Sequence, residues 1–230
     1  MTVHSADLRS LTLARPDMPD AAFSPLFEDR PVRRLRDGAA LFAEGDERSH
    51  LFRVRDGLAT RLRHLPDGTR HVVGFAEPGA ILGLGLCGAE HGETVEAALR
   101  FAYQAAPMEA VAARLRARPD FAFDLVAEAT RQAREMEDLF VRRAHYPSHR
   151  MLADFLLRLR DAIGETPEGV LRLPILRSAI ADHLGFSAET ASRAFTRLRE
   201  LGLVDHADRS DARILDLPGL IALASGASEG

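Results

Sequence analysis

The sequence has 230 residues and a single cysteine, Cys87. One cysteine excludes a disulfide within the chain and a four-cysteine iron–sulfur site, and it is typical of proteins from a reducing compartment. No apolar run approaches the roughly 18 residues that span a membrane. The opening segment, MTVHSADLRSLTLARPD, has no basic part that leads into an apolar stretch, so it does not predict secretion. We therefore expect a cytoplasmic protein that does not contact a membrane.

Lysine is absent as well: all 30 basic residues are arginine, and with 34 acidic residues the formal net charge is −4. An acidic total does not favour binding to nucleic acid, because phosphate groups attract basic surfaces. A chain with this net charge can still carry a small basic patch that binds nucleic acid. The 46 % apolar and 28 % charged residues are typical of a soluble globular protein, and the length allows one large domain or two modest ones.

Residues 31–106 contain short apolar segments that glycines separate at intervals of 11 or 12 residues. The segments LFRVR, LATRLRHL and RHVVGF are rich in Val, Leu and Phe, and Gly57 lies between the first two. The sequence PDGT before the third is a strong turn signal. Short strands at this spacing predict a sandwich, a jelly roll or a barrel. We expect this β-domain to span residues 23–118, after an N-terminal extension at residues 1–22.

The pattern then changes to a helical period. Asp120 is placed as the cap of a helix that runs to about Ala144, on which six residues recur in alternating steps of four and three. Such a stripe is expected for a helix that lies on its own domain and for a helix that pairs with a second chain. Charged residues on both flanks favour the second interpretation, so we expect a homodimer through a dimerisation helix at residues 119–145. The stripe consists of Leu125, Ala129, Gln132, Met136, Leu139 and Arg143.

The C-terminal part, residues 146–230, contains short elements in the order of a winged helix. Pro147 ends the long helix, and SHRMLADFLLRLRDAIG follows as an amphipathic helix. The strand VLRLP precedes two short helices joined at Gly185, which allows the positive φ of a tight turn. The strands LVDH and ARILDL then flank a wing, ADRSD, and PGLIALA closes the domain with a turn or helix. This order predicts a helix-turn-helix with a wing.

The second helix of the pair separates apolar from polar side chains. Ser187 is a preferred N-cap residue at its start. Ala191, Ala194, Phe195 and Leu198 share the side that would pack on the preceding helix. The helix is therefore expected to lie with this side on its own domain and the opposite side outward.

The opposite side carries Glu189, Ser192 and Arg193 at i, i+3 and i+4. On an arbitrary helix these residues would form a solvated face, and a carboxylate in the first turn also favours the helix dipole. The second helix of a helix-turn-helix, however, enters the major groove, where Arg binds guanine O6 and N7 and Glu accepts from cytosine N4. We therefore predict that these three residues read bases. Looser expected contacts to DNA phosphates are Ser178, Thr190, Arg197, Arg209 and Arg213.

Over residues 38–217 the chain resembles the CRP/FNR family of bacterial transcription regulators. The first half, LFAEGDERSHLFRVRDGLATRLRHLPDGTRHVVGFAEPGAILGLG, shares the family's order of EGD, a strand, a glycine, a DG turn, and PG followed by G-x-G. The second half, IADHLGFSAETASRAFTRLRELGLV, carries the E-x-x-S-R signature of the FNR and FixK branches at Glu189, Ser192 and Arg193.

The resemblance implies an α+β fold with an N-terminal jelly-roll β-barrel like a cyclic-nucleotide-binding domain, a long dimerisation helix and a C-terminal winged helix-turn-helix. It also implies a homodimer that binds palindromic double-stranded promoter DNA with TTGA-type half-sites. The two second helices would enter successive major grooves about one turn, ~34 Å, apart. Contact with RNA polymerase and activation of transcription are further expectations from the resemblance.

The β-domain lacks residues that ligand-binding members of the family use. The cysteines of an FNR-type iron–sulfur cluster are missing, and Leu84 stands where cyclic-nucleotide binders have a ribose-binding Glu. No Arg or Lys lies between Arg70 and Arg100 to bind a buried phosphate. We therefore expect no cofactor, no iron–sulfur cluster and no cyclic AMP. A FixK-like regulator that needs no ligand and is controlled by its own abundance fits these absences best.

Two alternative functions involve a bound ligand or an enzymatic reaction. A ligand-gated regulator would sense haem, nitric oxide or a small metabolite in the β-domain, with His50, His64, His71 or His91 as haem ligands or Cys87 as a redox switch. A cupin-like enzyme would need paired histidines, but the chain contains no H-x-H, G-x-S-x-G or H-E-x-x-H motif. We expect that the protein is not an enzyme, with no catalytic residue and no metal ligand.

Overall fold

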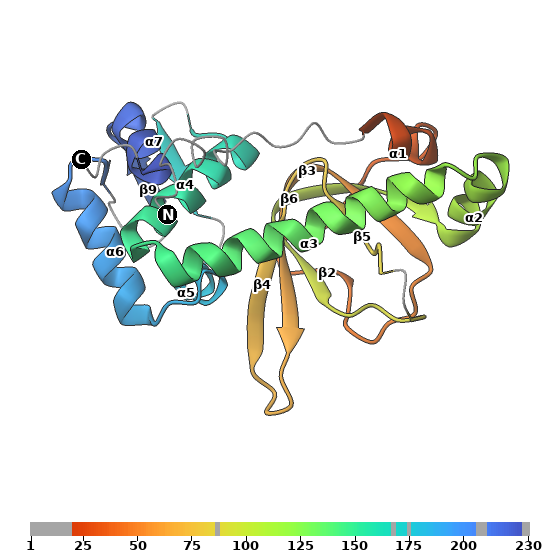
Figure 1. Ribbon diagram of the computed structural model, residues 1–230, viewed down its shortest axis with the longest axis horizontal. Coiled ribbons are helices and arrows are strands. Elements are labelled where there is room, and N and C mark those ends of the chain that lie inside the picture. The colour runs from red at the N-terminus through yellow and green to blue at the C-terminus, as the bar shows by residue number, and fades with distance from the viewer. Residues whose placement is uncertain (1–19, 86–87, 167–168, 174–175, 206–210, 227–230) are drawn as a thin grey trace, which may run out of the picture.

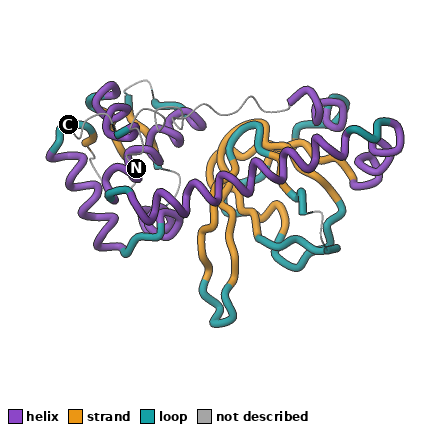
Figure 2. Tube along the Cα trace, viewed as in Figure 1, coloured by secondary structure: helices purple, strands orange, loops and turns teal. Residues whose placement is uncertain are grey.

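The computed structural model describes residues 20–85, 88–166, 169–173, 176–205 and 211–226. Figure 1 shows two bodies along one long helix, α3 (Phe121–His145), with a β-domain against one part of it and a helical domain at its C-terminal end. Figure 2 shows that strands dominate the first body and helices the second. The α+β fold predicted from the sequence is confirmed. In the described part of the chain, no helix is long and apolar enough to cross a bilayer.

The β-domain contains one six-stranded antiparallel sheet with short helices beside it. The strand order is β1-β6-β3-β4, with β2 paired to β6 and β5 paired to β3. Helix α1 starts within the segment assigned to the N-terminal extension and packs on α2 and β6. The elements are α1 (Asp20–Phe27), β1 (Arg33–Arg34), β2 (Ala40–Phe42), β3 (His50–His64), β4 (Arg70–Ala76), β5 (Ile81–Leu82), β6 (Thr94–Pro107) and α2 (Met108–Ala117).

Strand β3 is longer than the sequence predicts. The glycine between LFRVR and LATRLRHL indicates two strands, but both segments belong to β3. Gly57 lies inside this strand with a φ of +79°, and a Cβ atom there would meet the backbone oxygen of Leu99 at 2.1 Å. The pairing of β3 with β6 also shifts register on both sides of it. Gly57 therefore marks a close approach of two strands rather than a chain reversal.

The second domain is a helix-turn-helix with a small sheet, whose strands pair in the order β7-β9-β8. Gly185 has a φ of +71° and makes the turn between α5 and α6, as predicted. Residues 206–210, which hold most of the predicted wing, lie outside the described residues. The elements are α4 (Ser148–Ile163), β7 (Val170–Arg172), α5 (Arg177–Leu184), α6 (Ala188–Glu200), β8 (Val204–Asp205), β9 (Asp211–Ile214) and α7 (Leu217–Ser225).

Helix α3 begins at Phe121, but Asp120 does not cap it as predicted. The backbone of Asp120 is already helical, with φ −61° and ψ −17°, and its side chain accepts no hydrogen bond from the first turn. A capping side chain reaches those N–H groups from an extended backbone, so this detail of the prediction is wrong. At the other end, Tyr146 and Pro147 form a two-residue connection to α4.

Apolar side chains of the two domains meet in one packed junction. Leu58 of β3 is fully buried in the same cluster as the core of the helical domain. Phe75 of β4 lies with its ring centroid 5.5 Å from that of Phe155 on α4 and 4.9 Å from that of His183 on α5. The outer face of the β-domain therefore contributes to the core of its neighbour.

Two arginines add polar contacts across this junction. Arg143, in the last turn of α3, donates a hydrogen bond to the backbone oxygen of His183. Arg100, which has a φ of +43°, donates to the backbone oxygen of Ile163 at 3.4 Å. Both acceptors lie near helix C-termini, where carbonyl groups lack helical partners and a cation is favourable.

We expect protonation of His183 to destabilise the folded chain. Burial, followed by the charges of Arg143, Arg158 and Arg142, lowers the pKa of His183 from 6.5 to about 4. Because the folded state holds the imidazole neutral, this stabilisation is complete above pH 6.5 and is lost as the pH falls toward 4. Chemical denaturation should show a decrease of about 2–3 kcal/mol in the free energy of unfolding between pH 6.5 and about 4.5.

The variant His183→Gln removes the titrating group, so its free energy of unfolding should fall less over the same pH range. His145→Gln, at an exposed position at the end of α3, is the matched control and should behave like the wild type. An equal decline in the wild type and in His183→Gln would contradict the assignment.

Candidate nucleic-acid interface

Helix α6 starts with a side-chain cap. Ser187 has an extended backbone, and its Oγ accepts the N–H of Thr190 at 3.1 Å. The hydroxyl of Thr190 lies 2.9 Å from the same Oγ. The first four N–H groups of a helix have no carbonyl partner within it, and this cap gives one of them a hydrogen bond. The cap predicted from the sequence is confirmed, and it determines where the helix begins.

One face of α6 is buried within its own domain. The four residues predicted to pack there, Ala191, Ala194, Phe195 and Leu198, are all buried. The guanidinium of Arg177 on α5 lies 4.1 Å from the centroid of the Phe195 ring, which is the geometry of a cation–π contact. Because α6 contacts both α4 and α5 through this face, its rotation about its own axis is fixed.

Helix α6 lies on the side of its domain away from the β-domain (Figure 1), and its other face is polar and exposed. Glu189 and Arg193 are 73 % and 74 % exposed and form an ion pair one helical turn apart. Ser192 is exposed beside them. An exposed i,i+4 pair contributes little to stability, so both groups can turn to other partners. Together they offer guanidinium donors, carboxylate acceptors and a hydroxyl, which match the major-groove edges of guanine and cytosine.

The residues predicted to contact phosphates lie in different settings. Ser178 is exposed in the first turn of α5, and Arg213 is exposed on β9. Arg197 is exposed on α6 and lies 3.3 Å from the carboxylate of Glu200. Thr190 is partly buried and takes part in the cap. Arg209 lies outside the described residues.

The stripe on α3 that the sequence assigns to a partner chain mostly contacts its own chain. Leu125 is 4 % exposed and packs in a core with Phe121, so one chain already buries it. Gln132 donates from Nε2 to the backbone oxygen of Ile81 at 3.0 Å. Met136 is 62 % exposed, and its contact with a partner stays a prediction. The other members with contacts inside the chain are Ala129, Leu139 and Arg143.

A second row of apolar side chains on α3 is exposed. Val126 and Phe140 are 55 % and 72 % exposed, and Ala133 between them is exposed as well. Their spacing of seven residues is that of a paired helix. The sequence pattern does not distinguish this row from the predicted stripe, because Leu125 and Leu139 show a similar spacing one position earlier along α3. Contact with the β-domain decides which of the two rows is buried, and that contact leaves no local signal in the sequence.

Two of the residues considered for ligand binding are buried inside the β-domain. Leu84 is buried in a core with Leu51 and Ile81. His91 is buried and stacks on Phe42, with ring centroids 3.7 Å apart. Burial lowers the pKa of His91 below its usual value, so the imidazole is held neutral.

The other three histidines considered as haem ligands have separate partners. In the part of the chain that the structure describes, no group of three or more His, Cys, Asp or Glu side chains is arranged to hold a metal ion. Cys87 lies outside the described residues. The partners are Ser49 for His50 at 2.9 Å, Glu44 for His64 at 3.4 Å and Asp182 for His71 at 2.6 Å.

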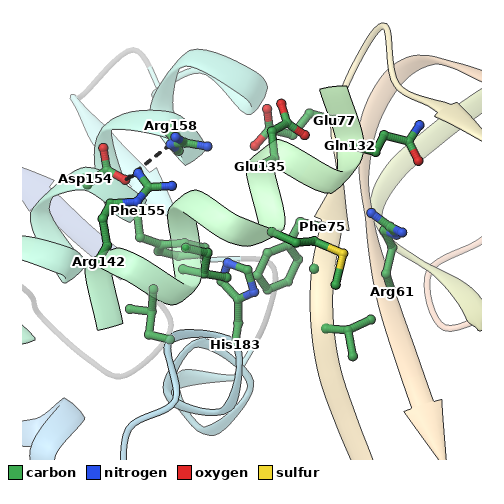
Figure 3. A pocket seen from close by; sticks show the side chains of 15 residues that line it. Arg61, Phe75, Glu77, Gln132, Glu135, Arg142, Asp154, Phe155, Arg158 and His183 are labelled. Carbon is green, nitrogen blue, oxygen red and sulfur yellow. Dashed lines mark hydrogen bonds and ion pairs between the residues drawn. The ribbon is translucent and has the colours of Figure 1, made fainter. Parts of the chain in front are cut away.

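A pocket of about 130 Å³ lies at the junction between the domains, where α3 passes between them. Figure 3 shows Phe75 and His183 together in this pocket, with Arg142, Asp154 and Arg158 to one side. Asp154 lies 2.8 Å from Arg142 and 3.3 Å from Arg158, so one carboxylate pairs with two guanidinium groups. The volume is below the ~300–1,000 Å³ of ordinary ligand sites.

Both domains match known families. Residues 151–223 match the Crp-like helix-turn-helix domain, and residues 32–105 match the cyclic nucleotide-binding domain. The structure of FixK2 from Bradyrhizobium japonicum has a TM-score of 0.71 at 23 % identity, over 84 % of this chain and 96 % of that one. This likeness shows the fold: the β-domain, the long helix and the winged helix-turn-helix occur in the same order.

Relatives with curated names extend over both domains. The transcriptional activator protein FnrA of Stutzerimonas stutzeri is 30 % identical over 200 residues, which cover 86 % of this chain and 82 % of the relative. The nitrogen fixation regulation protein FixK of Rhizobium meliloti (strain 1021) is 32 % identical over 203 residues, which cover 88 % and 90 %. The chain therefore belongs to the CRP/FNR family of transcription regulators.

Proposed function

We propose that the protein is a homodimeric transcription activator that reads a palindromic promoter element of the FNR/FixK type, with TTGA half-sites. The observation that carries the proposal is the exposed face of α6, where Glu189, Ser192 and Arg193 lie together on the second helix of a helix-turn-helix. The names of FnrA and FixK describe an activator and a regulator, which supports activation, and contact with RNA polymerase is part of the proposal.

Base reading requires the ion pair on α6 to separate. Arg193 then donates two hydrogen bonds to guanine O6 and N7, and Glu189 accepts from cytosine N4. Four residues of helix rise span about 6 Å, which is a little less than two base-pair steps of about 3.4 Å. The two side chains can therefore address bases within two steps of each other, with the hydroxyl of Ser192 between them. Exposed Ser178, Arg197 and Arg213 are the proposed phosphate contacts, which set the register without reading sequence.

Dimerisation follows from the surface of α3. Val126, Ala133 and Phe140 form an exposed apolar row, and an exposed row on a long helix is stabilised when a second copy covers it. The 25 residues of α3 extend for about 37 Å, which gives room for three heptads. Two-fold pairing of this helix would present two copies of α6 to one DNA duplex.

The β-domain is proposed to work without a ligand. No Arg or Lys lies between Arg70 and Arg100 to bind a cyclic phosphate. Buried Leu84 stands where cyclic-nucleotide binders have the carboxylate that binds ribose. A regulator of this kind responds to its own concentration, because dimer and DNA binding both increase with the amount of protein.

Arg193→Ala should weaken binding to the preferred palindrome by roughly 1–3 kcal/mol and relax the preference at one base position. Arg197→Ala is the contrasting variant, because loss of a phosphate contact should weaken binding evenly across sequences and reduce the salt dependence. Gel-shift titrations with sites selected from random DNA measure both effects. Equal binding of the wild type to matched and scrambled palindromes would contradict base reading.

Phe140→Glu should produce monomers with little affinity for the palindrome, because it places a carboxylate in the exposed row of α3. Met136→Glu tests the stripe assigned from the sequence, and light scattering measures the mass of each variant. Dissociation by Phe140→Glu alone supports the row through Val126, Ala133 and Phe140. Dissociation by Met136→Glu alone restores the earlier stripe, and intact dimers in both cases exclude pairing through α3.

Cyclic AMP should neither bind the purified protein nor change its affinity for DNA, since no Arg or Lys lies between Arg70 and Arg100 to bind the phosphate. Isothermal titration calorimetry measures binding, and gel shifts with and without the nucleotide measure the effect on DNA. An absorption spectrum tests the haem alternative in the same sample. Tighter DNA binding with cyclic AMP, or a Soret band, would replace the ligand-free proposal by the ligand-gated one.

A further inference from the structure

The first helix of the helix-turn-helix is attached to the β-domain through one carboxylate. Nδ1 of His71 on β4 lies 2.6 Å from Oδ1 of Asp182 on α5. The backbone N–H of Val72 donates to Oδ2 of the same carboxylate at 2.5 Å. The two carboxylate oxygens of Asp182 thus contact two neighbouring residues of β4, a strand that is distant from α5 in the sequence. Hydrogen bonds to a carboxylate are among the stronger ones that a protein makes.

Strand β4 is shaped for this contact. It is the outermost strand of its sheet, where backbone N–H groups on the outer side lack strand partners. Its pairing with β3 shifts between Arg61 and Leu62, so that Val73 is an extra residue in β4. Such a bulge twists a strand and redirects its backbone groups. The N–H of Val72, next to the bulge, is the group that Asp182 accepts.

The covalent connection between α3 and α4 does not fix the orientation of the winged helix by itself. It consists of Tyr146 and Pro147, and the proline ring restrains its own φ, at −58°, and keeps the preceding Tyr146 extended. Rotation about the neighbouring single bonds would swing α4 and everything after it. The contacts across the junction must therefore set the angle, and Asp182 provides two of the polar ones.

Helix α6 moves with α5. Ile180 and Leu184 of α5 are buried in one cluster with Phe195 and Leu198 of α6, and the turn between the helices is short. Figure 1 shows α5 between α6 on one side and β4 on the other. A rotation of α5 against β4 would therefore turn the reading face of α6 by the same angle.

We propose that Asp182 is a positioning residue that sets the spacing between half-sites that the dimer accepts. The proposal rests on the proposed function, because it needs two copies of α6 on one duplex. Pairing through α3 fixes the two β-domains relative to each other, and Asp182 fixes each α6 to its own β-domain. One extra base pair moves a half-site by about 3.4 Å and turns it by about 34–36°. A rigid pair of reading helices accepts one spacing, whereas a loosened pair accepts several.

The test measures the affinity of the full chain for a series of palindromes. All carry the half-site that the wild type selects from random DNA, and the spacer between half-sites changes by one base pair at a time. The wild type should lose on the order of tenfold or more in affinity for each change, because the DNA must bend or twist to restore the match. Asp182→Ala should reduce this penalty to within about threefold, with the base preference inside each half-site unchanged.

His71→Ala removes the side-chain half of the contact from the side of the β-domain, and only the backbone N–H of Val72 remains on Asp182. The substitution lies outside the winged helix, so it tests the proposal even where Asp182→Ala does not fold. It should flatten the spacing profile in the same direction, and the double variant should resemble Asp182→Ala because both changes act on one contact. Asp161→Ala, at an exposed carboxylate on α4, is the matched control and should keep the wild-type profile.

The outcomes separate the two proposals. A wild-type spacing profile in folded Asp182→Ala and His71→Ala overturns the positioning role, whatever happens to overall affinity, because a merely structural contact would weaken all spacings alike. A wild type that does not prefer palindromes to scrambled DNA refutes the proposed function itself, and the positioning role falls with it. A flattened profile with unchanged base preference supports both.

Discussion

The molecule depends on the packing of α6 through one face. Ala191 and Ala194 are small and buried, and the larger Phe195 and Leu198 are buried on the same face of the helix. Burial of each large apolar side chain stabilises by about 1.5–3 kcal/mol, whereas an exposed ion pair such as that of Arg193 contributes a few tenths. The apolar face therefore decides how the helix is rotated, and the polar face points outward as a consequence.

Local signals in the sequence predict the winged helix well because each acts over a few residues. Gly185 tolerates the positive φ of the turn, Ser187 supplies an oxygen to the first turn of α6, and Pro147 separates α3 from α4. Where two local explanations compete, the sequence does not choose between them. Gly57 is compatible with a turn and with a close approach of strands, and Asp120 is compatible with a cap and with a first helical turn.

Contacts between distant segments are the part that could not be predicted. The helical period shows that Leu125 and Leu139 share a face of α3, but it does not show that the β-domain and the winged helix cover that face. The contact between His71 and Asp182 joins residues that are 111 positions apart, and neither residue type is unusual in its segment. The residues of the exposed face of α6 were predictable because a single short helix carries all of them.

The pairing of Glu189 with Arg193 affects how the protein searches a genome. Any phosphate backbone attracts a lone guanidinium, whatever the sequence beside it. A carboxylate one turn away cancels most of that attraction, and the whole chain has a net charge of −4. If α6 reads bases as proposed, residence on random DNA is brief, and longer binding requires bases that satisfy the acid and the guanidinium at once. Weak attraction to the wrong sites then contributes to selectivity together with strong attraction to the right ones.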